Sequence, residues 1–461
     1  MRVPTSPGIT LNEKNNVNHA SSCQGERLKR EIGVWGIFIN VINNTIGSGI
    51  FLLPAIVAGV LGNASIVAYI ACGLLFLLVM LCYAEISSQV TCSGGSYAYI
   101  EKAFGSYAGF ISNTLFWFGV GVFVTAALVN GFADILSVAF PIFKIPLYRA
   151  LLFIALIGFS AYINILGVKQ GMKVIKIVTL IKMLPLFLLV VLGFWGSKLL
   201  NLRMDHLPTF QNLGEVSLVL FFAFAGGETA LNIGGEMKNP SRTAPLGIMY
   251  GMLATILIFC LIQLAAQGVL GAGLSNFKEA PLAAVADNLI GPVGHTIIIV
   301  ASLIAIFGIL SSLPLAFPRV MLAGAEDNLL PRYLAKIHPR FATPANAIVT
   351  FSAIAFLVAV SGGFRQLAVI VSASLLLLYV GVVLATIKFR LKKNTDKKDT
   401  FKIPGGLVIP IAALVALCFF IVQLQLKEIV GIVIFIGILS IIYLIKITRK
   451  RQLDKILLAE V

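Results

Sequence analysis

The chain has 461 residues, of which 59% are hydrophobic and only 12% are charged. A soluble globular protein carries charged residues at about a quarter of its positions, so this chain has too little polar material to cover a soluble protein of its length. The formal net charge of +16 would suit a nucleic-acid-binding protein, but the placement of the basic residues excludes that interpretation, as described below.

Long apolar runs indicate helices that cross a bilayer, because about 20 apolar residues span its hydrocarbon core. We predict twelve such spans and therefore an all-α polytopic membrane protein. Two of them are longer than a bilayer requires, and we expect these to be tilted or to extend beyond it. In chain order the spans are 33–60, 65–90, 107–140, 147–167, 171–195, 213–236, 243–271, 283–325, 345–361, 365–391, 405–424 and 428–447.

Lysine and arginine gather at alternate ends of these spans. Most of the 35 basic residues lie in one set of segments, whereas the loops between them hold few. The positive-inside rule then places both termini in the cytoplasm, which requires an even number of spans. The basic surplus is thus a topology signal, with a secondary role in binding anionic lipid. The basic set is 1–31, the loops near 102, 169–176, 238–242, 319–340 and 388–402, and the C-terminal end.

The remaining composition gives no sign of a metal site, a cofactor or an enzyme. Residues 1–31 are polar and lack the apolar region of a signal peptide, so we expect a disordered cytoplasmic tail, with a second tail at 449–461. The six cysteines show no CxxC spacing, and the four histidines are dispersed without an HExxH motif. We therefore predict no catalytic residues, no metal, no cofactor and no disulfide framework.

Two predicted spans contain glycine and polar residues where the bilayer midplane should be. The first has Gly47-Ser48-Gly49 followed by Pro54, and the sixth has Ala225-Gly226-Gly227-Glu228-Thr229. The spans lie five apart, and this odd offset means that the second unit is inverted relative to the first. Interrupted helices at matching positions in two halves indicate the binding site of a transporter. The alternative is that these glycines are ordinary helix-packing contacts.

Several motifs resemble those of the amino acid–polyamine–organocation (APC) transporter superfamily, in particular its bacterial amino acid permeases and antiporters. They run in family order over most of the chain, and together they are far more specific than any one alone. The motifs are Gly47-Ser48-Gly49-Ile50-Phe51 with Pro54, Ser93–Tyr99 with Ala103-Phe104-Gly105, Phe222–Glu228, Glu236–Arg242 with Pro245, and Asp327–Pro331.

The resemblance implies a fold with a five-plus-five inverted repeat (LeuT-like) in which helices 1 and 6 are broken. Residues 32–195 would form the first repeat with helices 1–5, and residues 213–392 the second with helices 6–10. Helices 11 and 12 would occupy 404–448. The two tails, 1–31 and 449–461, complete the expected organisation.

The expected site recognises the two charges of an amino acid with the protein backbone. A helix that starts inside the membrane offers unpaired N–H groups and a positive dipole end to a carboxylate. The expected donors are Ser48, Gly49 and Ile50, beside Ile46 and Gly47. By resemblance, the carbonyls that accept from the ammonium belong to Thr45, Phe222 and Ala225, next to Gly226.

Side chains would then select the substrate. Carried over by position from the related antiporters, Phe116, Val124, Phe222 and Leu313 face the substrate side chain, and Phe222 can also act as a gate. This set is apolar, which favours a neutral, aliphatic substrate. The alternative for these residues is ordinary core or lipid-facing packing.

Two ionisable residues are expected to couple or gate transport. Lys182 lies in mid-span, where an ammonium group is unfavourable and usually marks function; its context resembles a fifth-span lysine that replaces bound sodium in some family members. A buried lysine can also exchange a proton, and the alternative is that Lys182 reaches to the membrane edge. Glu228 adjoins the sixth-span break, where capping is the alternative role. Glu85 is expected to brace a loop by pairing with a basic residue.

The sequence therefore predicts a secondary active amino acid transporter that works by alternating access, through exchange or proton coupling. One alternative is a cationic amino acid or polyamine antiporter, and another, of a different class, is a membrane solute sensor or channel. The expected partners are an amino acid substrate, protons and the lipid bilayer, with no nucleic acid. We expect a multi-pass protein of the cell (inner or plasma) membrane, either a monomer or a homodimer.

Overall fold

A computed structural model describes residues 32–90, 95–166, 168–204, 207–326, 329–341, 343–392, 401–403 and 405–459. Within these residues the protein is helical, and its β-type pairing is limited to one isolated bridge between Ile32 and Met237. The N-terminal tail 1–31 and the motif residues Ser93, Gly94, Asp327 and Asn328 lie outside the described residues.

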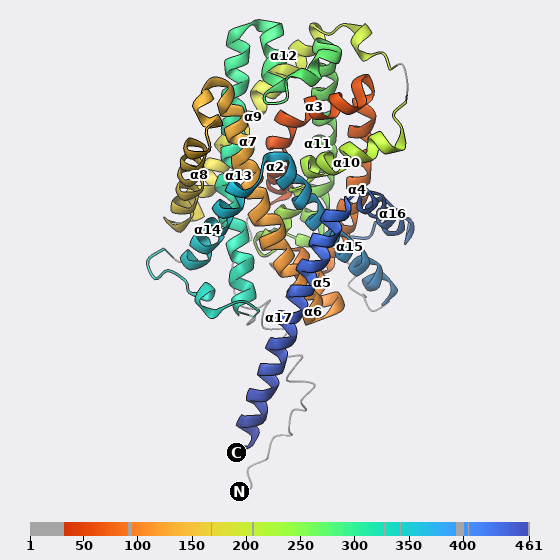
Figure 1. Cartoon of the computed structure of the whole chain (residues 1–461). Helices are drawn as coiled ribbons and strands as arrows, with labels where there is room; N and C mark the ends of the chain where they lie inside the picture. Colours follow the sequence, from red (N-terminus) through yellow and green to blue (C-terminus); the bar gives the residue numbers. More distant parts are fainter. Residues whose placement is uncertain are drawn as a thin grey trace.

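The first half of the chain forms helices that are joined by short turns (Figure 1). They include one interrupted pair at the start and one π-helical stretch, η3, inside a long continuous helix. The elements are α2 (Val34–Thr45), α3 (Ser48–Leu61), α4 (Ser65–Gln89), α5 (Ser96–Phe104), α6 (Ser106–Thr114), η3 (Leu115–Val122), α7 (Phe123–Ala139), α8 (Pro146–Leu166) and α9 (Val168–Trp195).

The second half begins with another interrupted helix, in which α10 is followed by the 3-10 helix η6. Helices α11, α12 and α13 each start with proline. Proline lacks an N–H group, but an N–H at the first helical position would have no hydrogen-bond acceptor within the helix, so nothing is lost there. The elements are α10 (Phe210–Phe224), η6 (Gly227–Glu236), α11 (Pro240–Leu270), α12 (Pro281–Ile290), α13 (Pro292–Glu326), α14 (Ala345–Ser361), α15 (Phe364–Leu391), α16 (Val408–Val422) and α17 (Leu426–Ala459).

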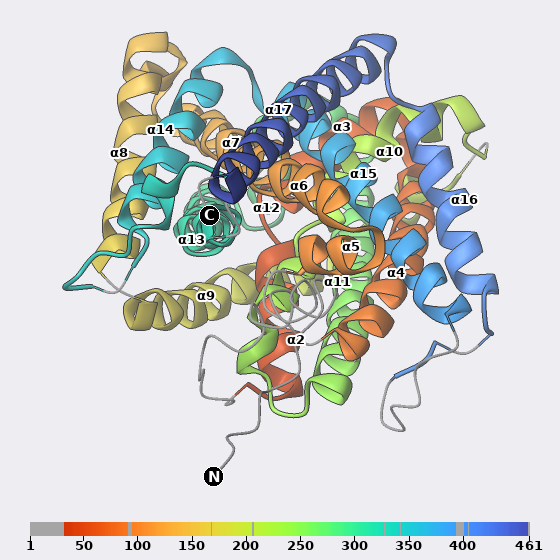
Figure 2. The same ribbon diagram turned by 90° about the horizontal axis from the view of Figure 1, so that it is seen from below.

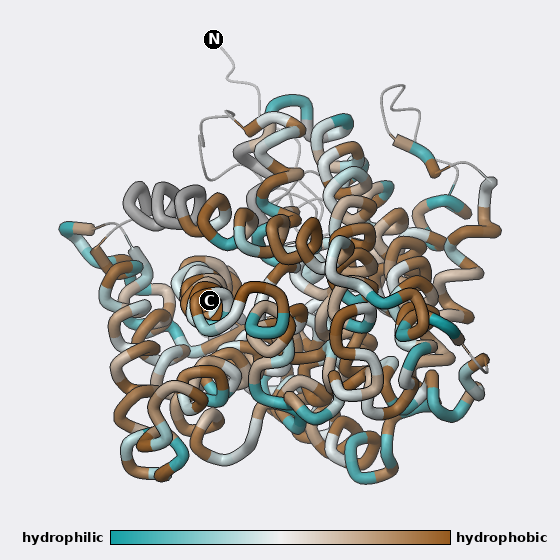
Figure 3. The backbone as a smooth tube through the Cα atoms, turned by 90° about the horizontal axis from the view of Figure 1, so that it is seen from above, coloured by the Kyte–Doolittle hydropathy of each residue, from teal (hydrophilic) through white to brown (hydrophobic). Residues whose placement is uncertain are grey.

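Hydrophobic residues are frequent in the peripheral helices as well as in the central ones (Figure 3), and many large hydrophobic side chains are exposed. Nine helices in the described part of the chain are long and apolar enough to cross a membrane. On α9, for example, Leu180, Leu184 and Phe187 are all more than 60% exposed. A continuous exposed surface of this kind is stable in lipid and not in water, so the fold is that of a polytopic membrane protein.

The core lies where α4, α10 and α15 meet, and it is rich in aromatic residues. Phe76 of α4 packs edge-on against Phe221 of α10 and Tyr379 of α15, with ring centroids 5.4 and 5.6 Å apart. Helix α11 packs along both α2 and α4, and α10 packs along α3. The views in Figures 1 and 2 agree in placing α2 beside α11. The two interrupted helices are thus held at the centre of the bundle.

Some predicted spans differ in detail from the structure. The predicted span 283–325 is two helices, because the chain turns at Gly291, whose φ of +71° favours glycine. The predicted span 107–140 contains the π-helical η3. Helix α17 continues beyond the predicted twelfth span to Ala459, as Figure 1 shows.

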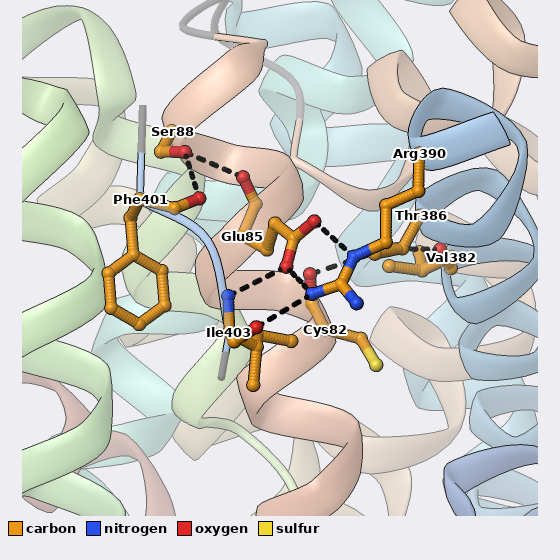
Figure 4. Close-up of polar contacts among 8 residues, drawn as sticks. All are labelled: Cys82, Glu85, Ser88, Val382, Thr386, Arg390, Phe401 and Ile403. Atoms are coloured by element: carbon orange, nitrogen blue, oxygen red, sulfur yellow. Dashed lines mark hydrogen bonds and ion pairs between the residues drawn. The ribbon is translucent and has the colours of Figure 1, made fainter. Parts of the chain in front are cut away.

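A buried ion pair ties α4 to α15 and to the segment that precedes α16 (Figure 4). Arg390 donates to both carboxylate oxygens of Glu85, and the Nε contact is 2.6 Å long. Glu85 also accepts the N–H of Ile403 at 2.9 Å, while Ser88 donates to the carbonyl of Phe401. The prediction that Glu85 pairs with a basic residue beside a loop is confirmed, and the partner is Arg390.

We expect Glu85→Ala to destabilise the protein strongly. The change leaves Arg390 without its carboxylate and the N–H of Ile403 without its acceptor, and breaking a buried pair costs about 3–5 kcal/mol. The matched control is Glu215→Ala, which removes an exposed pair with Arg365 at 3.8 Å and should change stability by less than about 1 kcal/mol. Thermal unfolding of the purified variants in detergent measures both, and equal melting temperatures for the two would contradict the prediction.

Candidate functional site

The first helix is interrupted between Thr45 and Ser48. Helix α2 ends at Thr45, Ile46 and Gly47 have non-helical dihedral angles, and α3 starts at Ser48. Ser48, Gly49 and Ile50 therefore form the first turn of α3, whose N–H groups have no partner within that helix. A Cβ atom on Gly49 would lie 2.9 Å from the Cα atom of Ala223. Glycine is required at this position because the start of α3 touches the backbone of α10.

The second interruption follows Phe224, the last residue of α10. Ala225 is extended, Gly226 has a φ of +112°, and η6 begins at Gly227. A Cβ atom on Gly226 would lie 2.6 Å from the carbonyl oxygen of Asn44. Glycine is needed here for two reasons, the left-handed backbone and the close approach of α2. The two helix breaks are consequently in direct contact.

Polar side chains join the two breaks. The Asn44 amide donates to the Thr229 hydroxyl at 2.7 Å, and Thr229 in turn donates to the carbonyl of Gly226 at 2.5 Å. The Thr45 hydroxyl is buried beside Gly227 and has no hydrogen-bond partner in the described part of the protein. An unpaired buried hydroxyl at a helix break is available for a polar ligand, because burial without a partner is unfavourable.

Lys182 of α9 is fully buried and holds the end of the first half-helix. Its ammonium group donates to the carbonyl oxygens of Asn43 at 2.7 Å and of Ile46 at 2.8 Å. Thr179, one turn earlier, donates to the side-chain oxygen of Asn43 at 2.7 Å. Within the described residues no carboxylate lies within 4.0 Å of the Lys182 ammonium group. The side chain thus points into the break rather than toward a membrane edge.

Glu228 is buried at the start of η6, where it accepts the N–H of Gly226 at 2.9 Å. The hydroxyl groups of Tyr83 and Tyr379 are close enough to interact electrostatically with its carboxylate. Glu228 therefore caps the broken helix and also places an acidic group among α4, α15 and the second break. The two roles considered for it, capping and gating, are compatible with this position.

The four residues predicted to face the substrate side chain, Phe116, Val124, Phe222 and Leu313, do not all lie at the helix breaks. Phe222 lies one turn before Gly226, and its ring packs edge-on against Phe364 at 5.7 Å. Phe116 lies in η3 against Phe317, with ring centroids 5.2 Å apart. Ile309 of α13 packs directly against Gly47. Because Leu313 is one helical turn beyond Ile309, Leu313 lies on the same face of α13, the face that is directed toward the first break.

Val124 is half-buried at the start of α7 and packs against the same core cluster as Phe116 and Leu313. Among the described residues, no polar or ring contact connects Phe116, Val124 or Leu313 with the two breaks. Their assignment to the substrate side chain stays a prediction.

Sequence reasoning missed the side chains that connect the breaks. Asn43, Asn44, Thr179 and Thr229 form the polar links between α2, α9 and η6. The available signal was the presence of amide and hydroxyl groups inside apolar spans, where each needs a partner. Within the described residues, no cluster of three or more His, Cys, Asp or Glu side chains could hold a metal ion.

These features define a polytopic helical membrane protein with two interrupted helices that meet at its centre. Residues 32–448 match the amino acid permease family, and the chain belongs to this family. The resemblance to the APC transporter superfamily is confirmed.

Individual relatives include bacterial and plant transporters. The chain is 30% identical over 393 residues to the serine/threonine exchanger SteT of Bacillus subtilis (strain 168). This alignment covers 84% of this chain and 89% of SteT. It is 25% identical to the branched-chain amino acid permease BcaP of the same organism, over 97% of this chain and 100% of BcaP. It is also 25% identical to cationic amino acid transporter 1 of Arabidopsis thaliana, over 86% and 69% of the two chains.

Proposed function

We propose that this protein is a secondary active transporter of neutral amino acids that works by alternating access in the cell membrane. The observation that supports this most directly is the contact between the two helix breaks, which brings unpaired backbone groups and glycine together at the centre of the bundle. Transport would proceed by exchange or be driven by protons.

Twelve spans fit the helices of the structure. One of the nine long apolar segments, Gly49–Gln89, contains two helices that meet at the 3-10 turn Gly62–Ala64. Two shorter apolar helices, α14 and α16, have 17 and 15 residues and can span when they pack against longer neighbours. Dividing Gly49–Gln89 into two and adding α14 and α16 to the nine segments gives twelve spans. An even number is in keeping with both termini in the cytoplasm.

A five-plus-five inverted repeat is supported by matching element lengths. Each half starts with an interrupted helix and a long helix, then has a short helix of 9 residues (α5) or 10 residues (α12). The next continuous helical segment is Ser106–Ala139 with 34 residues in the first half and Pro292–Glu326 with 35 in the second. Each half ends with a helix of 28 residues, α9 or α15. The division of 283–325 into α12 and α13 gives the second half the short helix that the first half has in α5.

The proposed substrate site uses the first turn of α3 for the carboxylate. The N–H groups of Ser48, Gly49 and Ile50 carry the positive end of the half-helix dipole. The ammonium would bind carbonyl oxygens of Thr45, Phe222 and Ala225, with the unpaired Thr45 hydroxyl as a further polar group. This arrangement recognises what all free amino acids share.

A neutral substrate is favoured by the residues around the breaks. Phe222, Phe116, Val124 and Leu313 are apolar, and Glu228 already accepts the N–H of Gly226, so no free acid is assigned to a cationic side chain. Two of the relatives, a serine/threonine exchanger and a branched-chain amino acid permease, are named for uncharged amino acids.

Sodium coupling is disfavoured by Lys182. Its ammonium group lies on two carbonyl oxygens of the first break, and backbone carbonyls at such breaks are the ligands that coordinate sodium in related folds. A fixed positive charge on these oxygens repels a second cation. We therefore propose that transport is independent of sodium.

The proposal is tested with purified protein in liposomes preloaded with unlabelled serine, threonine, leucine or arginine. We expect labelled serine, threonine or leucine to accumulate by exchange, with equal rates in sodium and potassium buffers. An imposed inward proton gradient, with empty liposomes, separates proton-driven uptake from exchange. Absence of any amino acid flux from preparations that bind substrate would favour a sensor, and exchange restricted to arginine or polyamines would favour the cationic alternative.

A further inference from the structure

An open apolar groove lies on the outside of the bundle, between α2 and α11 and away from the helix breaks. It has a volume of about 510 Å³ and is lined by Val34, Trp35, Phe38 and Tyr250. Trp35 is 74% exposed and Tyr250 is 50% exposed. Because these aromatic side chains face outward from a bundle whose outside is apolar, lipid is the medium next to the groove.

Two exposed basic residues, Lys238 and Arg242, lie near one end of this groove. The backbone N–H of Lys238 donates to the carbonyl of Ile32 at 2.8 Å, which places Lys238 beside Ile32, two residues before the groove residue Val34. Arg242 lies in the first turn of α11, about two turns before Tyr250. Both basic side chains are exposed, and within the described chain neither has a carboxylate within 4.0 Å.

Two helix N-termini open toward the same end. Helix α2 starts at Val34 after Gly33, and α11 starts at Pro240 after Asn239; neither first residue receives a side-chain cap. The bridge between Ile32 and Met237 holds the two starts together. The positive ends of both helix dipoles therefore add to the charge of Lys238 and Arg242.

We propose that this groove binds an anionic phospholipid. The acyl chain lies along Trp35, Phe38 and Tyr250, and the phosphate lies at the paired helix starts between Lys238 and Arg242. A zwitterionic lipid also carries a phosphate, but its own ammonium group offsets that charge and is repelled by Lys238 and Arg242. Each basic residue near a membrane surface raises the affinity for an anionic lipid about fivefold, so two such residues distinguish anionic from zwitterionic lipid clearly. The site is separate from the proposed substrate site and does not depend on it.

The chain has three tryptophans, which provides a direct test with lipids whose acyl chains carry bromine, a contact quencher of tryptophan fluorescence. The full-length Trp117→Phe/Trp195→Phe variant, which keeps Trp35, is placed in bilayer discs of phosphatidylcholine. A small fraction of the lipid is brominated phosphatidylglycerol or, in parallel, brominated phosphatidylcholine. We expect severalfold stronger quenching by the anionic lipid, and expect Lys238→Gln/Arg242→Gln to make the two lipids equal.

Trp195, which is 92% exposed, is the matched control. In a Trp35→Phe/Trp117→Phe variant, Trp195 is the remaining tryptophan and reports general contact with lipid. Adding Lys238→Gln/Arg242→Gln to this variant should leave the quenching of Trp195 by both lipids unchanged. Equal quenching of Trp35 by the two lipids in the otherwise native protein would overturn the proposal. So would the absence of any quenching by either lipid, which would mean that lipid does not enter the groove.

Discussion

Replacing Lys182 by methionine is expected to reduce amino acid exchange by at least about tenfold while the protein remains folded. The carbonyl oxygens of Asn43 and Ile46 each lose a charge-assisted hydrogen bond, and such a bond contributes about 1.5–3 kcal/mol. These carbonyls fix the end of α2 at the first break, so their release should disturb the substrate site before it affects the rest of the bundle. Initial rates of exchange in proteoliposomes measure the effect.

Methionine is chosen because it has nearly the length of lysine and leaves the core filled, which separates the loss of charge from the loss of packing. The control is Lys144→Met, since Lys144 is exposed and its pair with Glu279 has a separation of 3.5 Å; this variant should exchange at the native rate. Size-exclusion chromatography checks folding. Native exchange by a well-folded Lys182→Met protein would show that the lysine has no part in transport.

The sequence was sufficient for the class of fold because bilayer physics leaves a strong signal. Apolar runs of helix length predict where spans lie, and the structure has helices at each of them. The turn at Gly291 was missed because the residues on both sides, Leu289-Ile290 and Pro292-Val293, keep the run apolar. Hydrophobicity reports the surroundings of a residue, whereas the turn depends on the backbone conformation of one glycine.

The site was predictable to a smaller extent. Glycine and polar residues in mid-span indicated both interruptions, which lie at Ile46-Gly47 and Ala225-Gly226. The link from Asn44 to Thr229 was not predictable, because it joins positions 185 residues apart in the chain. Such a contact depends on the angle between two half-helices, which packing determines and local sequence does not.

Replacing Gly226 by alanine is expected to abolish exchange and to destabilise the protein. Two effects act together in this variant. A φ of +112° is unfavourable for any residue with a Cβ atom, at a cost of about 1–3 kcal/mol. The new Cβ atom would also lie 2.6 Å from the carbonyl oxygen of Asn44, a backbone atom that can move only if α2 moves with it. The two helix breaks would therefore separate, which opens the proposed site.

A second glycine separates these two effects. Gly291 has a φ of +71°, but a Cβ atom on it would meet no heavy atom within 4 Å. Gly291→Ala should consequently lose some thermal stability through backbone strain and still exchange amino acids at close to the native rate per folded molecule. If transport depends on contact between the breaks, Gly226→Ala should lose exchange even when it is assayed well below its melting temperature. Equal exchange by the two variants under that condition would mean that the contact between Gly226 and Asn44 has only a structural role, and that the substrate site does not need the breaks to touch.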